Sequence, residues 1–357
     1  MISRILSNDY PRSKILTGIL IAIVIGLFLQ PFVIPGAKAI NVAATILYFI
    51  VLVASFDLLL GYTGIFSFAH TMFFGIGAYG VAVASTKMGP GWDSLLIGVG
   101  GALAMSLVLS FVIGLMSLRV RALFYAMITL AVASAFLTMA GQFSDITGGD
   151  DGLNFKLPEL FSHAYMLFDK PILGLEINGK ILTYYVLFFM AIFLFLAMLR
   201  IVNSPFGRVL QAIRENDFRA EAIGYRIVIF RIWSNILAAL FATLAGCMLA
   251  LWLRYNGPDT SLSFTIMIDI LLIVVIGGMG TMYGAVCGAT FFLLAQNYLQ
   301  DLLKMASGVT GNIPVLSAIL TPDRWMLWLG ILFVLSVYFL PMGIVGKLRI
   351  FAMKKKK

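Results

Sequence analysis

Ionisable side chains inside long apolar runs are the residues of this sequence that could do chemistry. Three stand out, namely Asp57, His70 and Asp269. An ionisable group at membrane depth is energetically costly and is by default a functional candidate. For the two aspartates a structural hydrogen bond, a place on a transport path and a contact with a partner subunit all stay open. His70 could equally be a buried imidazole that joins two helices.

Motifs typical of enzymes are missing from the sequence. It contains no G-x-x-x-x-G-K-[ST] phosphate-binding loop, no H-E-x-x-H, no G-x-S-x-G and no C-x-x-C. The two histidines, His70 and His163, offer few parts for histidine-based catalysis. Cys247 and Cys287 fall inside apolar runs, which argues against a disulfide or a metal cluster. We expect no catalytic residue, no metal site and no cofactor bound by this chain.

Glycines at regular spacing form a second group of candidates. Gly75, Gly77 and Gly80 match the G-x-G-x-x-G spacing, but they lie inside an uncharged apolar run, and the next acid, Asp93, follows too early for a dinucleotide fold. We expect these glycines to let another helix, or a substrate, approach the backbone closely. Glycines 280, 284 and 288 stand four apart, a spacing that favours tight helix packing.

Two glycine-rich turns each follow one of the intramembrane aspartates. The segment 61–64 follows Asp57, and the segment 277–280 follows Asp269. Each predicts a tight turn or a broken helix, and together they suggest two related halves. Interrupted helices at matching places often mark a transport path.

The composition indicates which structural elements position these candidate residues. Of the 357 residues 61% are hydrophobic and 11% are charged, and the mean hydropathy is +1.01, whereas a soluble domain carries roughly 25% charged residues. Because a span needs about 20 apolar residues, the chain supplies about ten, and continuous runs predict helices. The expected spans are 15–34, 42–60, 64–85, 94–118, 122–141, 181–199, 232–253, 262–279, 284–300 and 325–346. The predicted fold is an all-α polytopic membrane protein.

The positive charge predicts how the spans are oriented. With both termini in the cytoplasm, 17 of the 25 Lys and Arg residues fall on the inner side, in agreement with the positive-inside rule. The net charge of +9 is therefore spread around the spans, not gathered on one face as nucleic-acid binding requires. Basic residues before the first run and Ala37-Lys38-Ala39 after it also outline a signal peptide, but a run of 20 residues favours a retained helix.

The domain organisation follows from these spans. We expect a cytoplasmic N-terminus at 1–14, a transmembrane domain at 15–346 and a basic cytoplasmic tail at 347–357. Within the domain, the outer loop 142–180 and the cytoplasmic segment 200–231 are too long to be mere connectors, and loops of such length are usually functional.

The cytoplasmic segment carries the strongest signal. Pro205 can begin a helix and Gly224 can end one, and the pattern predicts helix from 209 to 223. Its apolar surface would consist of Val209, Leu210, Ile213, Ala220 and Ile223. Such a helix between two spans can transmit a push from a soluble partner; the alternative is a helix that lies among the lipid headgroups.

Several blocks occur together in an order typical of one family. They are GYTGIFSFAH (61–70), FGIGAY (74–79), TGGDDGL (147–153) and IGGMGTMYG (276–284), joined by AEAIG (220–224), which is like a shortened Glu-Ala-Ala loop. With these blocks, residues from about 40 to 345 resemble the LivM-type permeases of branched-chain amino acid ABC importers. The chain departs from the family pattern at Ala69, where relatives often have Gly, and in a less regular Glu-Ala-Ala block.

The resemblance implies a function and partners. The chain would be a multi-pass permease of the bacterial inner membrane that moves branched-chain or related hydrophobic amino acids inward. It would pair with a LivH-type sister permease, two cytoplasmic ABC ATPase subunits that hold ATP and Mg, and an extracytoplasmic substrate-binding protein. The ATPase-coupling residues would be Pro205, Gly207, Arg208, Ala212, Ile213, Arg214, Glu215, Ala220, Glu221, Ala222 and Gly224. The translocation path would include Ser67, His70, Gly75, Gly77, Tyr79, Thr147, Gly148, Gly149, Asp151, Gly152, Asp269, Gly277, Gly278 and Gly280.

Other functions stay open at this point. Permeases of the same type serve urea, amides and aromatic acids, and the permease sequence does not separate these substrates. An ion-coupled secondary transporter would use Asp57, Asp269 and His70 as a relay for protons or sodium. An intramembrane enzyme is disfavoured, because the sequence offers no plausible pair of nucleophile and base.

Overall fold

The computed structural model describes residues 13–34, 36–116, 122–162, 178–309 and 321–354. Parts of the expected termini (1–12 and 355–357), of the outer loop (163–177) and of the fourth connection (117–121) lie outside the described residues. The helices of the described chain are α2 (Lys14–Val33), α3 (Ala37–Thr63), α4 (His70–Met88), α5 (Trp92–Met116), α6 (Ala122–Gln142), α7 (Ser144–Thr147), α8 (Gly179–Val202), α9 (Pro205–Glu215), α10 (Asp217–Ala222), α11 (Ile227–Leu253), α12 (Pro258–Ser261), α13 (Phe264–Gly277), α14 (Met282–Val309), α16 (Trp325–Phe339) and α17 (Gly343–Lys354).

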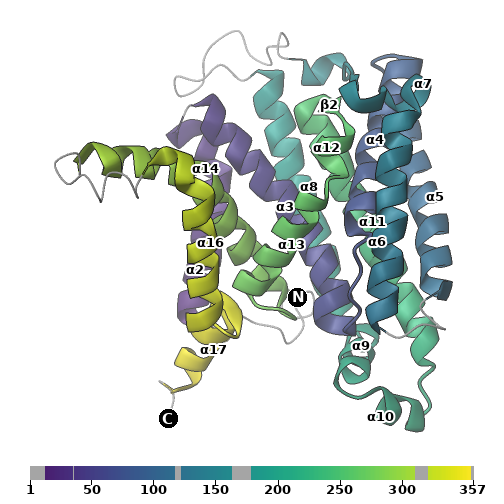
Figure 1. Cartoon of the computed structure of the whole chain (residues 1–357), viewed down its shortest axis with the longest axis vertical. Helices are drawn as coiled ribbons and strands as arrows, with labels where there is room; N and C mark the ends of the chain where they lie inside the picture. Colours follow the sequence, from purple (N-terminus) through teal and green to yellow (C-terminus); the bar gives the residue numbers. More distant parts are fainter. Residues whose placement is uncertain (1–12, 35, 117–121, 163–177, 310–320, 355–357) are drawn as a thin grey trace.

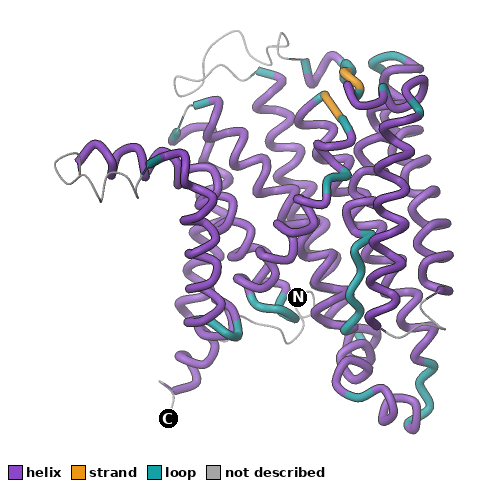
Figure 2. The backbone as a smooth tube through the Cα atoms, in the orientation of Figure 1, coloured by secondary structure: helices purple, strands orange, loops and turns teal. Residues whose placement is uncertain are grey.

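The prediction of an all-α polytopic membrane protein is confirmed. Among the described residues, eight helical segments are long and apolar enough to cross a membrane, namely α2, α3, α5, α6, α8, α11, the pair α12–α13 and the pair α16–α17. The two remaining expected spans coincide with α4 and α14. Short strands β1 (Leu153–Asn154) and β2 (Tyr255–Asn256) pair antiparallel and form a small ribbon that contacts α4 at one end of the bundle (Figure 1 and Figure 2).

Burial divides the helices into a centre and a rim. Within the apolar stretch of each helix, 94% of the residues of α3 and 78% of those of α11 are buried. The corresponding share is 17% in α2 and 22% in α6. Helix α11 packs against both α3 and α4 in the middle, and α5 packs against α4 and α11. The exposed apolar side chains of the rim helices are those that a bilayer would cover.

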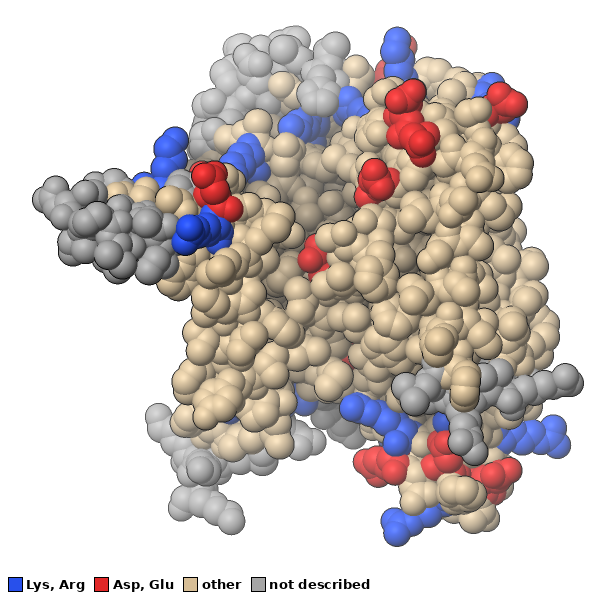
Figure 3. Space-filling model, viewed as in Figure 1, with Lys and Arg blue, Asp and Glu red and all other residues tan. Residues whose placement is uncertain are grey.

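The two ends of the bundle differ in what they carry. Helices α9 and α10 lie at one end of the bundle, and α7 and β2 lie at the opposite end (Figure 1). Helix α2 begins, and α17 ends, at the end that carries α9 and α10 (Figure 1). On the face shown in Figure 3, most Lys, Arg, Asp and Glu side chains gather toward these two ends, and the band between them is largely free of charge. This distribution is typical of a protein that crosses a bilayer.

Two expected spans differ from the structure. The third span does not begin at Gly64, because helix resumes only at His70 and residues 64–69 form a loop inside the bundle (Figure 2). Gly64 ends α3 with φ 75°, and the N–H groups of Gly64 and Ile65 donate to the carbonyls of Leu60 and Leu59. This pattern of bonds terminates a helix.

The last expected span, 325–346, also breaks. Helix α16 ends at Phe339 and α17 begins at Gly343. Pro341 between them has no N–H to donate and cannot continue the helix. Gly343 has φ 69°, a conformation that glycine adopts without strain.

Candidate functional site

Helix α9 begins with a cap that its sequence encodes. The side chain of Ser204 accepts a hydrogen bond from the N–H of Gly207 at 3.4 Å, and Pro205 occupies the first turn. The side chains of Val209, Leu210 and Ile213 are buried. Helix α9 contacts α3, α8 and α11, so its apolar face packs against these three helices.

The expected continuous helix from 209 to 223 is wrong. Asn216 has extended backbone (φ −161°, ψ 105°) and ends α9, and its side-chain oxygen accepts the N–H of Arg219 at 3.0 Å, which starts α10. An asparagine that caps a helix in this way competes with continuation of the preceding one. Arg231 of α11 pairs with Asp217 at 2.7 Å and holds α10 in place.

The structure separates the predicted coupling residues into two groups. Gly207, Ile213 and Ala220 are buried inside the chain, whereas the exposed members are Pro205, Arg208, Ala212, Arg214, Glu215, Glu221, Ala222 and Gly224. Ile223, expected on the apolar surface, is instead 76% exposed. Phe218, which the sequence analysis missed, is 86% exposed. The sequence feature that could have indicated an exposed Phe218 is its position between the charged residues Asp217 and Arg219.

The side chain of Arg214 turns back toward the bundle. Its guanidinium donates to the carbonyl of Gly61 at the end of α3. Next to it, the N–H of Gly280 donates to Asp57 Oδ1 at 2.8 Å. A Cβ on Gly280 would lie 2.7 Å from Arg214 Nη1. The two glycine turns therefore meet beside Arg214, between α9 and the rest of the bundle.

The loop 64–69 has two unlike sides. Ile65, Ser67 and Ala69 are buried, while Phe66 and Phe68 are partly exposed. The N–H of Phe68 donates to Thr129 Oγ1 of α6 at 3.0 Å, and Ser67 accepts the N–H of Ala69 at 3.3 Å. Protein groups thus replace part of the missing helical bonding on one side, and the other side stays open.

His70 begins α4 and is buried. Its Nε2 lies 2.8 Å from Ser55 Oγ of α3, and its ring packs edge to face on Phe56 at 5.2 Å. This is the arrangement expected of a histidine that joins two helices. Whether His70 and Ser67 also contact a transported molecule stays a prediction.

The glycines of the G-x-G-x-x-G motif let other elements approach α4. A Cβ on Gly77 would overlap the carbonyl of Thr243 in α11, and one on Gly75 would overlap Leu262. Cys247 of α11 donates to the Gly77 carbonyl at 3.4 Å. Protein thus fills the space beside both glycines, which agrees with the helix-approach interpretation.

The predicted block 147–152 folds as a compact cap at the end opposite α9. Gly148, Gly149 and Gly152 have φ of 77°, 63° and 70°. A Cβ on Gly152 would lie 2.6 Å from the carbonyl of Asn256 in β2. The hydroxyl of Tyr255 donates to the Asp151 carbonyl at 3.2 Å. The cap is therefore tied to the segment that follows α11.

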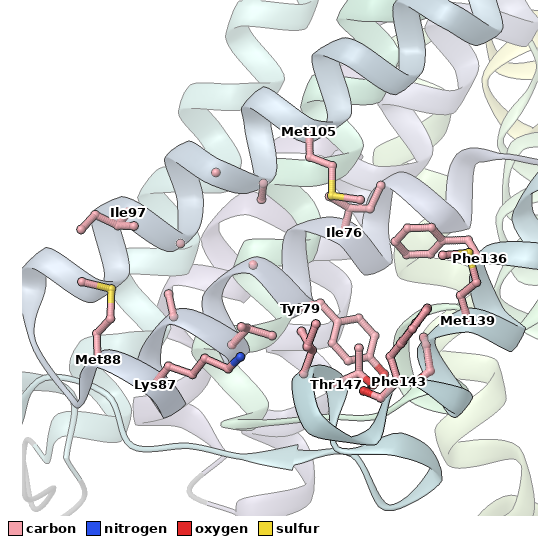
Figure 4. A pocket seen from close by; sticks show the side chains of 18 residues that line it. Ile76, Tyr79, Lys87, Met88, Ile97, Met105, Phe136, Met139, Phe143 and Thr147 are labelled. Carbon is pink, nitrogen blue, oxygen red and sulfur yellow. Dashed lines mark hydrogen bonds between the residues drawn. The ribbon is translucent and has the colours of Figure 1, made fainter.

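Two predicted path residues, Tyr79 and Thr147, line one pocket of about 480 Å³ between α4, α5 and α6. Its other lining side chains are mainly apolar, and Tyr79, Phe143 and Thr147 meet at one end of it, while Lys87 and Met88 lie toward the other (Figure 4). The hydroxyl of Tyr79 is buried and has no hydrogen-bond partner among the described residues. The pocket suits an apolar group, such as a hydrocarbon chain.

Asp269 and the second glycine turn belong to the hairpin of α13 and α14. Asp269 is partly exposed and forms a side-chain hydrogen bond with Gln296 of α14. A Cβ on Gly277 would overlap the carbonyl of Gly284, and one on Gly288 would lie 2.5 Å from the Ile273 carbonyl. The expectation that glycines pack the helices tightly is therefore confirmed for this pair.

The fold and the site together define a polytopic membrane transport protein, with a broken helix at membrane depth and an amphipathic helix under one end. The family model described as "Branched-chain amino acid transport system / permease component" matches residues 38–337, and the chain belongs to this family. It is therefore a transport permease and a multi-pass protein of the bacterial inner membrane.

Curated relatives agree with this assignment. The chain is 24% identical over 317 residues to the high-affinity branched-chain amino acid transport system permease protein LivM of Escherichia coli, covering 85% of this chain and 73% of the relative. It is 26% identical over 265 residues to the probable LivM of Methanocaldococcus jannaschii, covering 71% of each chain. No solved structure matches the chain.

Proposed function

We propose that this chain is the permease subunit of an ABC importer that moves branched-chain amino acids inward, with ATP hydrolysis on separate subunits. The observation that carries the proposal is the position of α9 and α10, which extend beyond one end of the bundle with Phe218 and Ile223 exposed. The chain itself has no G-x-x-x-x-G-K-[ST] loop to hold ATP, so we infer that it is not an enzyme. The names of its relatives supply the substrate class.

The end that carries α9 and α10 would face the cytoplasm. Under this orientation the six arginines of 200–231 lie inside, as the positive-inside rule requires. Both termini would then also be cytoplasmic, and the cap of 147–152 would face the extracytoplasmic binding protein. The exposed aromatic and aliphatic side chains of α10 suit an ATPase partner, because protein contacts concentrate their energy in such residues.

A substitution in α10 tests this partner surface. We expect Phe218→Ala to lower the affinity of the ATPase subunits for the permease about tenfold, as loss of a central aromatic contact does. Phe193→Ala is the matched control, because Phe193 of α8 is 71% exposed on the side of the bundle. Copurification of the ATPase with each detergent-solubilised variant measures the effect. Equal retention of the ATPase by both variants would contradict the proposed surface.

The open side of the loop 64–69 supports a second permease subunit. Non-helical backbone at membrane depth is tolerated only where protein or a water-filled cavity covers it. Phe66 and Phe68 lie partly exposed there, and Phe68 contacts Phe264 of α13 at 5.8 Å between ring centroids. We infer that a LivH-type sister permease covers this surface and that the path for the substrate runs between the two subunits.

The proposed path needs few charges. Asp269 lies on α13, the helix that begins at Phe264, and is the partly exposed acid of the two inside spans. Amino acids are zwitterions, and helix ends at glycine-rich breaks can meet their charged groups without fixed counter-charges. Specificity would then reside mainly in the binding protein. ATP binding would move α9 and rock the spans between outward-open and inward-open states.

Uptake measurements test the function. Proteoliposomes that contain this chain, its sister permease and the ATPase subunits should take up labelled leucine only when ATP and loaded binding protein are both supplied. Excess isoleucine and valine should compete, whereas urea, short amides and benzoate should not. Competition by one of the latter would assign the other substrate class.

The same system distinguishes an ion-coupled secondary transporter. Such a transporter would take up leucine without ATP, through this chain alone, when a proton or sodium gradient is imposed. The structure disfavours the relay this requires, because His70 and Asp57 are already engaged with Ser55 and Gly280. Uptake by the chain alone under an ion gradient would overturn the proposed function.

A further inference from the structure

We propose that Arg214 is a positioning residue that joins α9 to both glycine turns, so that movement of α9 displaces the two turns together. The first turn is residues 61–64 at the end of α3, and the second turn is residues 277–280, where α13 ends before α14. The proposal rests on the proposed function, because it names the residue through which a push from the ATPase would reach the spans. Arg214 would thus act inward, not as a contact with the ATPase.

The first turn lies directly against the side chain of Arg214. The guanidinium donates to the carbonyl of Gly61, one of the last carbonyls of α3. A cation at the C-terminal end of a helix also interacts favourably with the helix dipole. The aliphatic part of Arg214 covers Gly64, where an added Cβ would lie 3.2 Å from Arg214 Cγ. The guanidinium and the aliphatic part of the side chain therefore both lie against this turn.

The second turn meets the same guanidinium. A Cβ on Gly280 would lie 2.7 Å from Arg214 Nη1 and 2.9 Å from the Gly61 carbonyl oxygen. The opposite side of the turn is held by Asp57, which accepts the N–H of Gly280 at 2.8 Å. Gly280 is thus held between a carboxylate of α3 and a guanidinium of α9. Only a residue without a side chain fits there.

The turns are also suited to transmit movement further. Gly64, Gly278 and Gly280 all have positive φ, and glycines at element ends readily absorb backbone rotation. A Cβ on Gly278 would lie 2.8 Å from the carbonyl of Met342, next to the start of α17. Movement at Arg214 therefore reaches α3, the hairpin of α13 and α14, and α17. The loop 64–69, on the proposed path, follows the first turn directly.

The test uses the complete transporter in proteoliposomes. In Arg214→Ala we expect the ATPase subunits to stay bound and to hydrolyse ATP, while leucine taken up per ATP falls roughly tenfold, the effect of losing hydrogen bonds from a charged group. Arg214→Lys should recover part of the loss, since an ammonium can also donate to the Gly61 carbonyl. Gly280→Ala should uncouple transport in the same way, because its Cβ would displace the guanidinium.

Gly330→Ala is the matched control, because Gly330 lies in α16 with nothing within 4 Å of an added Cβ, and its uptake per ATP should equal that of the wild type. If Arg214→Ala does not yield folded protein, Arg214→Lys and Gly280→Ala carry the test. Release of the ATPase subunits by Arg214→Ala, or unchanged uptake per ATP in both Arg214→Ala and Gly280→Ala, would overturn the proposal. Absence of ATP-dependent uptake in the wild type would instead contradict the proposed function, and this proposal with it.

Discussion

Asp57 and Asp269 look alike in the sequence, since each lies in an apolar run shortly before a glycine turn, but their surroundings differ. Asp57 is 2% exposed and accepts the N–H of Gly280, which belongs to the turn that follows the other aspartate. Asp269 is partly exposed and bonds to Gln296 on the next helix of its own hairpin. Asp57 therefore links α3 to the turn between α13 and α14 by a hydrogen bond, whereas Asp269 stays partly accessible on α13.

The glycine turns that follow the two aspartates also differ in how soon the next helix begins. After the first turn the chain stays unwound to Ala69 before α4 begins, whereas after the second turn α14 begins at Met282. Close packing of Gly277 on Gly284 closes the second hairpin, whereas among the described residues no glycine pair joins α3 to α4 across the first turn. A shared motif therefore predicts a break in the helix, but the packing around it decides whether the break is a hinge, an open loop or a tight hairpin.

The largest effect should follow from Asp57→Ala. This change leaves the partly buried N–H of Gly280 without its acceptor and removes a negative charge close to Arg214. An unsatisfied donor costs about 1–3 kcal/mol of stability when it is fully buried, and we expect the lower part of this range here. We expect a clear fall in the thermal midpoint of the solubilised protein and a loss of leucine uptake. Asp57→Asn, which keeps an acceptor oxygen, should be milder.

Asp301→Ala provides the matched control for that measurement. Asp301 pairs with Lys38 at 2.5 Å, but both side chains are more than half exposed, and such surface pairs contribute about 0–1 kcal/mol. Its thermal midpoint should therefore change little. If Asp57→Ala were no less stable than Asp301→Ala, Asp57 would not stabilise the fold through its hydrogen bond with Gly280.

These contrasts also show how far the sequence predicts the fold. Each of the ten expected spans contains at least part of a helix, because a bilayer requires long apolar runs whatever the tertiary packing. The breaks were harder to place. The segment from 64 onward is as apolar as its neighbours, yet Gly64 ends α3 through its left-handed conformation. The hydrogen bond that supports the loop is accepted by Thr129 of α6, which is distant in the sequence.

The candidate site was predictable in part for a similar reason. The segment 204–224 was found as an amphipathic stretch, but its division at Asn216 depends on one side-chain bond to Arg219. The family resemblance implied that Arg214 is one of the ATPase-coupling residues. Its contact with Gly61 spans more than 150 residues of sequence, and no local pattern indicates it.

Asp269→Asn should have the smaller effect on the protein and should act on transport alone. Asparagine keeps the shape of the side chain and can still form a hydrogen bond with Gln296, so the thermal midpoint should stay near that of the wild type. If the carboxylate contributes to the path, the lost charge should lower leucine uptake roughly fivefold, the factor that corresponds to about 1 kcal/mol. Normal uptake by Asp269→Asn together with impaired uptake by a fully stable Asp57→Asn would reverse the assignment, because the buried aspartate would then be the one that serves transport directly.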